Sequence, residues 1–214
     1  MKYHRVDRKT ALKGSKGLMG SADKVLHERY GSDAAPQILE DAKREFDALI
    51  PEIPYVGGRK NFFSEMPVKA AVVLALYRAL QGRGVTLEEF GEILEAAAGV
   101  YMNTIPSWIR ALAGKLWMSR LFRRIIAKHA KVSLQKTYPD DFVYQVVPGS
   151  GKHAWGIDYL ECGITKFLAG QGASELARYA CVLDFVMFPA IGVTLERTET
   201  IAQGCRRCDF RFTK

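Results

Sequence analysis

Residues 142–160, FVYQVVPGSGKHAWGIDYL, decide the fold because the spacing of large apolar side chains changes there. Two runs in this stretch place every second side chain on one face of an extended chain. These side chains are Phe142, Tyr144 and Val146 in the first run, and Trp155, Ile157 and Tyr159 in the second. A period of two residues is typical of strands. Because the turn-forming residues Pro148-Gly149-Ser150-Gly151 separate the runs, the stretch predicts a β-hairpin.

The chain before the hairpin has helical periodicity instead. Helices are predicted over about 22–30, 36–49, 68–80, 86–101 and 106–134. The polar and basic residues 1–14 are expected to form an arm or a frayed helix. Ser64 is expected to begin the helix over 68–80. Thr86 and Glu89 form a capping box, in which each side chain accepts a hydrogen bond from the other residue's backbone N–H.

The chain after the hairpin mixes helices and strands. A short helix is predicted over 164–168 and a longer one over 174–188, followed by strands over 193–200 and 207–213. The predicted class is α+β, with a helical N-terminal half packed on a small, mainly antiparallel sheet from the C-terminal third. We expect one domain over 1–214, with a helical part over 1–137 and an α/β part over 138–214.

Composition limits the kind of protein. The 214 residues are 48% hydrophobic and 25% charged, which excludes a disordered or fibrous chain. The N-terminus has no apolar signal region, and the longest apolar run, 70–76, is too short to span a membrane. Four cysteines without an export signal are expected to be thiols in the cytoplasm. The net charge of +8 favours anionic partners, including a small anionic substrate.

The side chains that could carry chemistry lie in the last third of the chain. Cys162 precedes the short helix, where the helix dipole is expected to lower the pKa of its thiol. Cys181 and Asp184 are three residues apart and share a helix face that is otherwise almost wholly apolar. Cys208 begins the last strand. Each thiol alone is typical core filling, and Asp184 could simply pair with a basic residue, so their combination is the informative feature.

The pair Cys205-x-x-Cys208 raises the question of a metal. A structural zinc site needs four ligands, usually from two such pairs, and this chain has one pair. We therefore expect no metal site. Gly57-Gly58 and Gly82-x-Gly84 follow helical or irregular stretches and not strands, so they are interpreted as turns. No nucleotide, flavin or haem cofactor is expected.

Four segments carry a resemblance to a known family. They are DYLECGI over 158–164, ELARYACVLD over 175–184, LERTETIAQG over 195–204 and CDFR over 208–211. Their order and gaps resemble those of the L-2-amino-thiazoline-4-carboxylic acid hydrolase family, over roughly the last 60 residues. The resemblance implies hydrolysis of a cyclic amidine C–N bond, which opens a thiazoline ring to a carbamoyl-cysteine.

The resemblance also implies a set of site residues. The matching positions are Cys162, Cys181, Asp184, Glu196, Arg197, Thr200, Cys208 and Asp209, whereas Cys205 matches nothing in the family. Among the groups implied to be catalytic, a thiolate is the natural covalent nucleophile, with Cys162 the first choice and Cys208 the second. Asp184 would hold the amidinium or relay protons. Direct attack by water, with the thiols shaping the pocket, stays open.

The remaining matched positions are implied to bind substrate. Arg197, with Arg211, would bind the substrate carboxylate as a fork, beside Glu196, Thr200 and Asp209. Strand alternation predicts that Arg197 and Glu196 point to opposite faces, so both cannot line one pocket without a bulge.

Other classes of function compete with the hydrolase. A binding or sensor domain could hold a small ligand or metal through the same cysteines without turnover. The long helix over 106–134 carries a basic stripe of Arg120, Arg123, Arg124, Lys128 and Lys131. Such runs are usually solvated faces, and no nucleic-acid motif accompanies this one, so no nucleic-acid partner is expected. The stripe could also face anionic lipid or an acidic subunit. Trp108 and Trp117 are interpreted as core or as a subunit interface, which leaves a homo-oligomer open.

Overall fold

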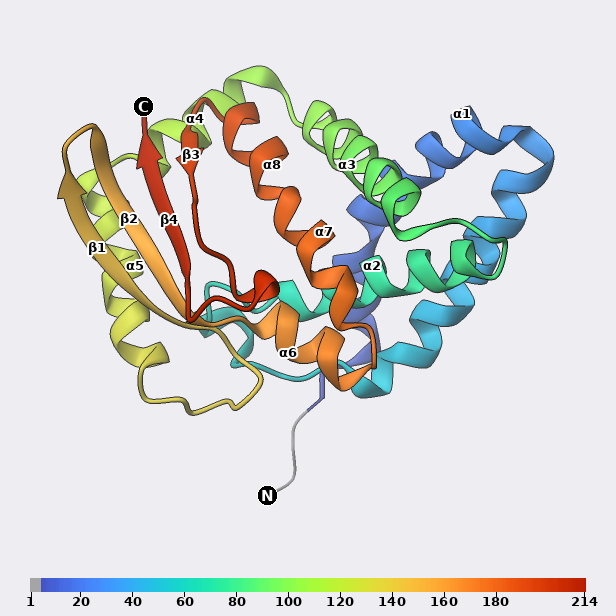
Figure 1. The fold of residues 1–214 in the computed structure, drawn as a ribbon, viewed down its shortest axis with the longest axis horizontal. Helices are drawn as coiled ribbons and strands as arrows, with labels where there is room; N and C mark the ends of the chain where they lie inside the picture. The colour runs from blue at the N-terminus through green and yellow to red at the C-terminus, as the bar shows by residue number, and fades with distance from the viewer. Residues whose placement is uncertain (1–4) are drawn as a thin grey trace.

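The computed structural model describes residues 5–214 as a helical layer beside a four-stranded sheet (Figure 1). The α+β prediction is confirmed. The helical layer contains α1 (Arg8–Leu49), α2 (Met66–Gln81) and α3 (Leu87–Thr104). The antiparallel sheet has the order β1-β2-β4-β3. Its strands are β1 (Val143–Ser150), β2 (His153–Glu161), β3 (Thr194–Glu196) and β4 (Cys208–Thr213). In the described chain, no helix is both long and apolar enough to cross a bilayer.

The helix α1 begins earlier than the sequence suggests. Asp7 caps it by accepting a hydrogen bond from the backbone N–H of Thr10 at 3.0 Å, and Ala11 and Ser15 are already buried. Of the two alternatives expected for residues 1–14, the arm is wrong from residue 8 onward, where the chain is helical, and residues 1–4 lie outside the described part. The two predicted helices over 22–30 and 36–49 are segments of α1, which is interrupted where Gly31 takes a positive φ of 75°.

The helix α2 forms the centre of the helical layer. Buried residues occur all round it, which is typical of a helix enclosed by others. Its predicted start at Ser64 is wrong, because Glu65 is the N-cap and makes no side-chain capping bond. The predicted capping box of α3 is confirmed, since Thr86 and Glu89 each accept from the other's backbone N–H.

The predicted helix over 106–134 is two helices, α4 (Ser107–Trp117) and α5 (Arg120–Ser133). The hydroxyl of Ser119 accepts the backbone N–H of Phe122 at 3.0 Å and starts α5 in a new direction. Trp117 and Phe122 pack at this corner with ring centroids 4.9 Å apart. The corner allows Trp117 to reach the sheet, where its ring lies 5.6 Å from that of Trp155. Trp117 is thus a core residue, as predicted.

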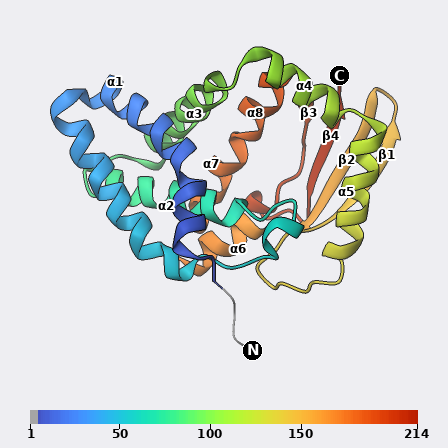
Figure 2. The same ribbon diagram turned by 180° about the vertical axis from the view of Figure 1, so that it is seen from behind.

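The predicted hairpin is confirmed as β1 and β2, with Tyr144 opposite Tyr159. Its turn is tighter than predicted, because Pro148, Gly149 and Ser150 belong to β1 and only Gly151 and Lys152 make the turn. The inner face of the sheet is aromatic and includes Trp155, Tyr159, Phe210 and Phe212. Figure 2 shows α5 running along β1 at the far end of the molecule. There the hydroxyl of Ser133 accepts the backbone N–H of Tyr144 at 3.1 Å and donates to its carbonyl at 3.3 Å. This contact covers part of an edge strand.

Helices from the C-terminal part lie between the sheet and the helical layer (Figure 1). The predicted short helix is α6 (Gly163–Gly170). The predicted longer helix is interrupted at Leu183, which divides it into α7 (Ala177–Val182) and α8 (Asp184–Ala190) after a 3₁₀ turn over Ser174–Leu176. Short 3₁₀ turns also occupy Ile50–Glu52, Gly58–Lys60 and Ile201–Gln203. The strand expected over 193–200 is limited to β3, because the chain leaves the sheet at Arg197.

Candidate active site

An ion pair between α8 and the end of β3 is the most distinctive polar feature of the C-terminal part. Arg197 donates from Nη1 to Oδ2 of Asp184 at 2.6 Å and from Nη2 to the carbonyl of Cys181 at 2.9 Å. The Arg197 side chain is 4% exposed, whereas that of Asp184 is 30% exposed. The guanidinium lies 4.9 Å from the ring centroids of both Phe185 and Phe210. A buried cation thus holds the carboxylate of a partly exposed side chain.

Local structure explains why this pair forms. The break at Leu183 ends α7, and carbonyls at a helix end need partners from outside the helix. Arg197 supplies one to Cys181. The same break puts Asp184 in the first turn of α8, where a carboxylate is favoured by the helix dipole. Asp184 therefore also has a structural role beside any chemical one.

The three predicted thiols gather around this pair. Cys208 lies opposite Tyr159 in the β2–β4 register, and its Sγ accepts the backbone N–H of Ile201 at 3.2 Å. Cys162 follows β2 and is the N-cap of α6. The pKa of Cys181 is affected by the charges of Cys162, Cys208 and Asp184, so the sequence-distant groups lie within electrostatic reach of one another. All four cysteines of the chain are free thiols.

The thiols are poor nucleophiles in this environment. Burial raises the pKa of Cys181 to about 12 and that of Cys208 to about 11. Burial also raises the pKa of Cys162, although the backbone N–H of Thr165 acts in the opposite direction. The prediction that the helix dipole lowers the pKa of Cys162 is therefore wrong, because loss of water outweighs the N-terminus of α6. At neutral pH these groups are thiols and not thiolates.

Asp184 behaves differently from the thiols. Burial raises the pKa of its carboxyl to about 6, and the neighbouring Arg197 limits that rise. A carboxyl group with a pKa near the working pH can both take and return a proton. Asp184 is thus the group in this cluster whose ionisation suits acid–base chemistry at neutral pH.

Tyr159 was not predicted as a site residue. Its ring packs between Phe63, 5.7 Å away, and Phe210, 5.0 Å away. Burial raises the pKa of its phenol well above 10, and the charge of Asp184 adds to this effect. Strand alternation places Tyr159 on the inner face, but the sequence gives no sign that this face meets Asp184.

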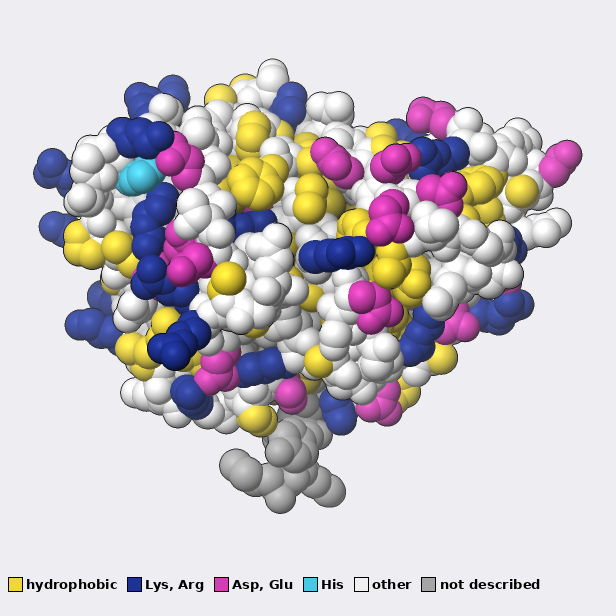
Figure 3. Space-filling view, viewed as in Figure 1, with side chains coloured by type: hydrophobic (Ala, Val, Ile, Leu, Met, Phe, Trp, Pro, Cys, Tyr) yellow, Lys and Arg dark blue, Asp and Glu magenta, His cyan; other side chains and the backbone are white. Residues whose placement is uncertain are grey.

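Four predicted substrate-binding residues lie apart from the cluster. Glu196 pairs with His153 at 3.1 Å and with Lys152, on the face opposite that of Arg197, as alternation predicted. Arg211 lies opposite Glu196 in the sheet register and pairs with Asp158 at 2.8 Å. Figure 3 shows cationic and anionic side chains intermixed over this side of the molecule.

The other two, Thr200 and Asp209, shape the loop after β3. The Asp209 carboxylate accepts the backbone N–H of Thr198 at 2.8 Å and that of Glu199 at 2.6 Å. These bonds lower the pKa of Asp209. The Thr200 hydroxyl donates to the side chain of Gln203 at 3.0 Å. Both residues therefore position the segment that carries Arg197, and neither contacts the Asp184 pair.

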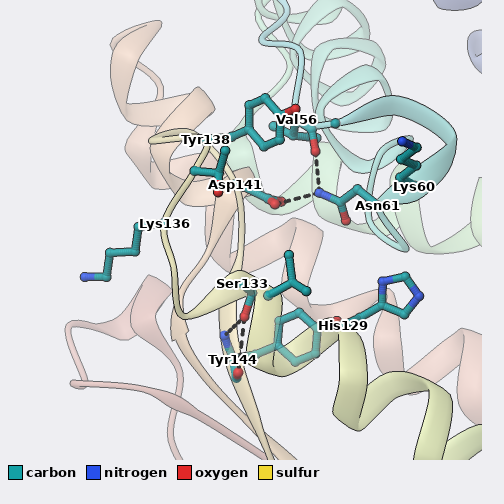
Figure 4. Close-up of a pocket in the computed structure, with 12 residues that line it drawn as sticks. Val56, Lys60, Asn61, His129, Ser133, Lys136, Tyr138, Asp141 and Tyr144 are labelled. Atoms are coloured by element: carbon teal, nitrogen blue, oxygen red, sulfur yellow. Dashed lines mark hydrogen bonds between the residues drawn. The ribbon is translucent and has the colours of Figure 1, made fainter.

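Two cavities open elsewhere on the described chain. One of about 510 Å³ lies between α4 and residues 189–192. The other, of about 250 Å³, lies between α5 and two loops, and its centre is shown in Figure 4. There Asn61 donates to Asp141 at 2.6 Å and to the carbonyl of Val56 at 2.5 Å. These polar groups bind each other and tie the loops together, which is a structural role. Within residues 5–214, no group of three or more His, Cys, Asp or Glu side chains is arranged to hold a metal ion.

Comparison with known protein families identifies one family over most of the chain. The profile of the family described as L-2-amino-thiazoline-4-carboxylic acid hydrolase matches residues 66–212, a range that includes Cys162, Asp184, Arg197 and Cys208. No curated protein matches the chain. A solved structure, the Fe(II) unliganded H-NOX protein from K. algicida, is 14% identical over 92% of this chain and 94% of its own, with a TM-score of 0.38. That score is too low to support an argument.

Proposed function

Because the chain belongs to the L-2-amino-thiazoline-4-carboxylic acid hydrolase family, we propose that it hydrolyses a cyclic amidine C–N bond in a small carboxylate substrate such as an amino-thiazoline. The observation that carries the proposal is the Asp184–Arg197 pair. It combines a carboxyl group of pKa about 6, on a partly exposed side chain, with a buried cation and a wall of aromatic and thiol side chains. Such a site supplies a base that ionises near neutral pH.

Water is the nucleophile in this proposal. The reacting ring carbon carries the ring nitrogen, the exocyclic nitrogen and the sulfur. As the water oxygen bonds to this carbon, the Asp184 carboxylate takes a proton from the water and passes it to the ring nitrogen. The carbon–oxygen double bond then forms and the bond from carbon to the ring nitrogen breaks. Both protons of the water end on that nitrogen, which leaves as an amine, and the sulfur keeps the carbamoyl group.

The thiols are assigned a supporting role. Because burial keeps Cys162, Cys181 and Cys208 protonated, attack by a thiolate would first require an unfavourable ionisation. Cys162 and Cys208 form, with Tyr159 and Phe210, the apolar side of the cluster, which strengthens electrostatic interactions there. This supports the water-attack alternative over covalent catalysis by Cys162.

Arg197 is assigned to positioning. Nη1 already donates to Asp184 and Nη2 to the carbonyl of Cys181, and the side chain is only 4% exposed, so a substrate carboxylate has little access to the remaining N–H groups. Held in this way, Arg197 orients the carboxylate and prevents its pKa from rising further.

The test is turnover of L-2-amino-thiazoline-4-carboxylate, followed as the mass gain of one water. Cleavage of the C–N bond releases an amine, whereas cleavage of the C–S bond would release a thiol, so amine and thiol reagents distinguish the products. Asp184→Asn is expected to lower the rate at least about 100-fold. The matched control Asp33→Asn, at an exposed site on α1, is expected to leave it unchanged.

Two results would overturn the proposal. The first is an Asp184→Asn variant as active as the wild type. The second is a folded wild-type protein that binds the amino-thiazoline without converting it, which would indicate a ligand-binding domain.

A further inference from the structure

The positive charge of the chain is concentrated in one segment. Residues 96–139 contain eight of the 31 Lys and Arg residues and none of the 23 Asp and Glu residues. The rest of the chain therefore has 23 of each and is formally neutral, so this segment accounts for the whole net charge of +8. The segment includes α4 and α5. An uneven distribution of this kind points to an anionic partner at these two helices.

The same helices expose large apolar side chains. On α4, Trp108, Leu112 and Leu116 recur every four residues and share a face, and Trp108 is 68% exposed. On α5, Leu121, Ile125 and Val132 share a face in the same way, with Leu121 63% exposed. Of the 14 large apolar side chains that are exposed in the described chain, eight lie between residues 108 and 134. Of the two interpretations of Trp108, the core residue is wrong and the subunit interface stays a prediction.

Cations border the apolar stripe of α5. Arg124, Lys128 and Lys131 are spaced by four and three residues and are exposed beside it. None of the ion pairs found among residues 5–214 includes them. The opposite face of α5 is buried at Ile126 and Ala130, against the sheet (Figure 2). The helix therefore presents an apolar stripe and a row of unpaired cations to the outside.

We propose that this α4–α5 surface, formed by the exposed apolar and basic side chains of Ser107–Ser133, binds an anionic membrane surface. Exposed Lys and Arg beside exposed Trp and Leu are typical of segments that lie in the headgroup region, and α4 and α5 together supply this combination. Trp108 suits that region, where tryptophan is enriched. The cations meet the acidic headgroups while the apolar side chains enter the acyl boundary.

Other partners fit this surface less well. Two copies of the chain that met through it about a twofold axis would bring like charges together, since the surface contains no acidic residue. A nucleic acid would pair with the cations but would leave the Leu and Ile side chains in water. An anionic lipid surface complements both the charge and the apolar stripe.

The test is flotation of the full chain with vesicles, comparing phosphatidylcholine alone with a mixture of phosphatidylcholine and phosphatidylserine. Binding is expected only to the mixture and is expected to weaken as salt is added. Replacing Arg124, Lys128 and Lys131 with Gln should weaken it about 100-fold, at roughly fivefold for each cation. Leu121→Ser with Ile125→Ser should weaken it about tenfold while the salt dependence remains.

The matched control is Lys9, Lys13 and Lys16 replaced with Gln. These residues are exposed on α1 with the same spacing, so the loss of charge is identical and binding should be retained. An equal loss in both triple variants would overturn the proposal by showing that total charge alone acts. Tighter binding to duplex DNA than to the vesicles would also overturn the proposal. A dimer that dissociates in Leu121→Ser would overturn it as well.

Discussion

Arg197 and Asp184 differ in how strongly each side chain needs the other as an ion-pair partner, because they differ in burial. The cation is almost wholly buried, so it needs its partners, whereas the carboxyl group keeps some contact with water. This asymmetry fits the positioning role that is proposed for Arg197. The spacing of the two residues along the chain gave no indication that they would meet.

Arg197→Met is expected to destabilise the fold by about 2–3 kcal/mol, less than for a fully buried pair because Asp184 is partly exposed. Removing the cation should also raise the pKa of Asp184 above about 6, because Arg197 now lowers it. Urea unfolding and an NMR titration of the Asp184 carboxyl would measure the two effects. Arg124→Met, at an exposed site on α5, is the control and should change neither. An unchanged Asp184 pKa in Arg197→Met would refute this account of the pair.

The four thiols should differ in their reaction with iodoacetamide at neutral pH. Cys162 and Cys208 are buried and have raised pKa values, and the pKa of Cys181 is about 12, so all three should be modified slowly. Cys205 is partly exposed and should be modified first. Peptide mass mapping at short times checks the order. Rapid labelling of Cys162 would instead indicate a thiolate and restore its role as a nucleophile.

At the scale of elements, α4 is held by a close approach of its backbone to the loop after α8. A Cβ atom added at Gly114 would lie 1.8 Å from the carbonyl oxygen of Ile191, so Gly114→Ala must move one of the two segments. We expect a loss of stability of about 2 kcal/mol or more. Gly99, in α3, has no such neighbour, and Gly99→Ala should stabilise by about 0.5–1 kcal/mol.

Thermal or urea unfolding of the two variants measures this difference. Because both substitutions add the same methyl group inside a helix, helix propensity cancels in the comparison. If Gly114→Ala were as stable as Gly99→Ala, α4 would not pack closely against the 189–192 loop.

The sequence predicted elements well where a local signal sets them. The hairpin follows from strand alternation, and α3 follows from the Thr86–Glu89 capping box. The sequence failed to predict the two places where one helix ends and another begins inside a continuous apolar pattern. Ser119 restarts a helix inside a continuous apolar pattern, and the break at Leu183 has no glycine or proline to mark it. Periodicity alone cannot detect such breaks, because the apolar pattern continues across them.

At the scale of the whole molecule, the site depends on contacts between distant segments. The sequence identified Cys162, Cys181, Asp184 and Cys208 as candidates, and the fold brings them within electrostatic reach of one another. It could not predict how much water surrounds them, which decides their pKa values. Nor could it show that Asp209 ties down the loop after β3 or that Arg211 pairs with Asp158. Burial is a property of the complete fold and not of any motif.

The pH dependence of kcat/KM for amino-thiazoline ring opening tests the central claim most directly. Asp184 acts as a base only when it is ionised, so the rate should rise with pH through about 6 and then level off. In Asp184→Asn this rise should disappear together with most of the activity. A rate that instead keeps rising toward about pH 11, where the Cys208 thiol ionises, would contradict the claim and indicate a thiolate nucleophile.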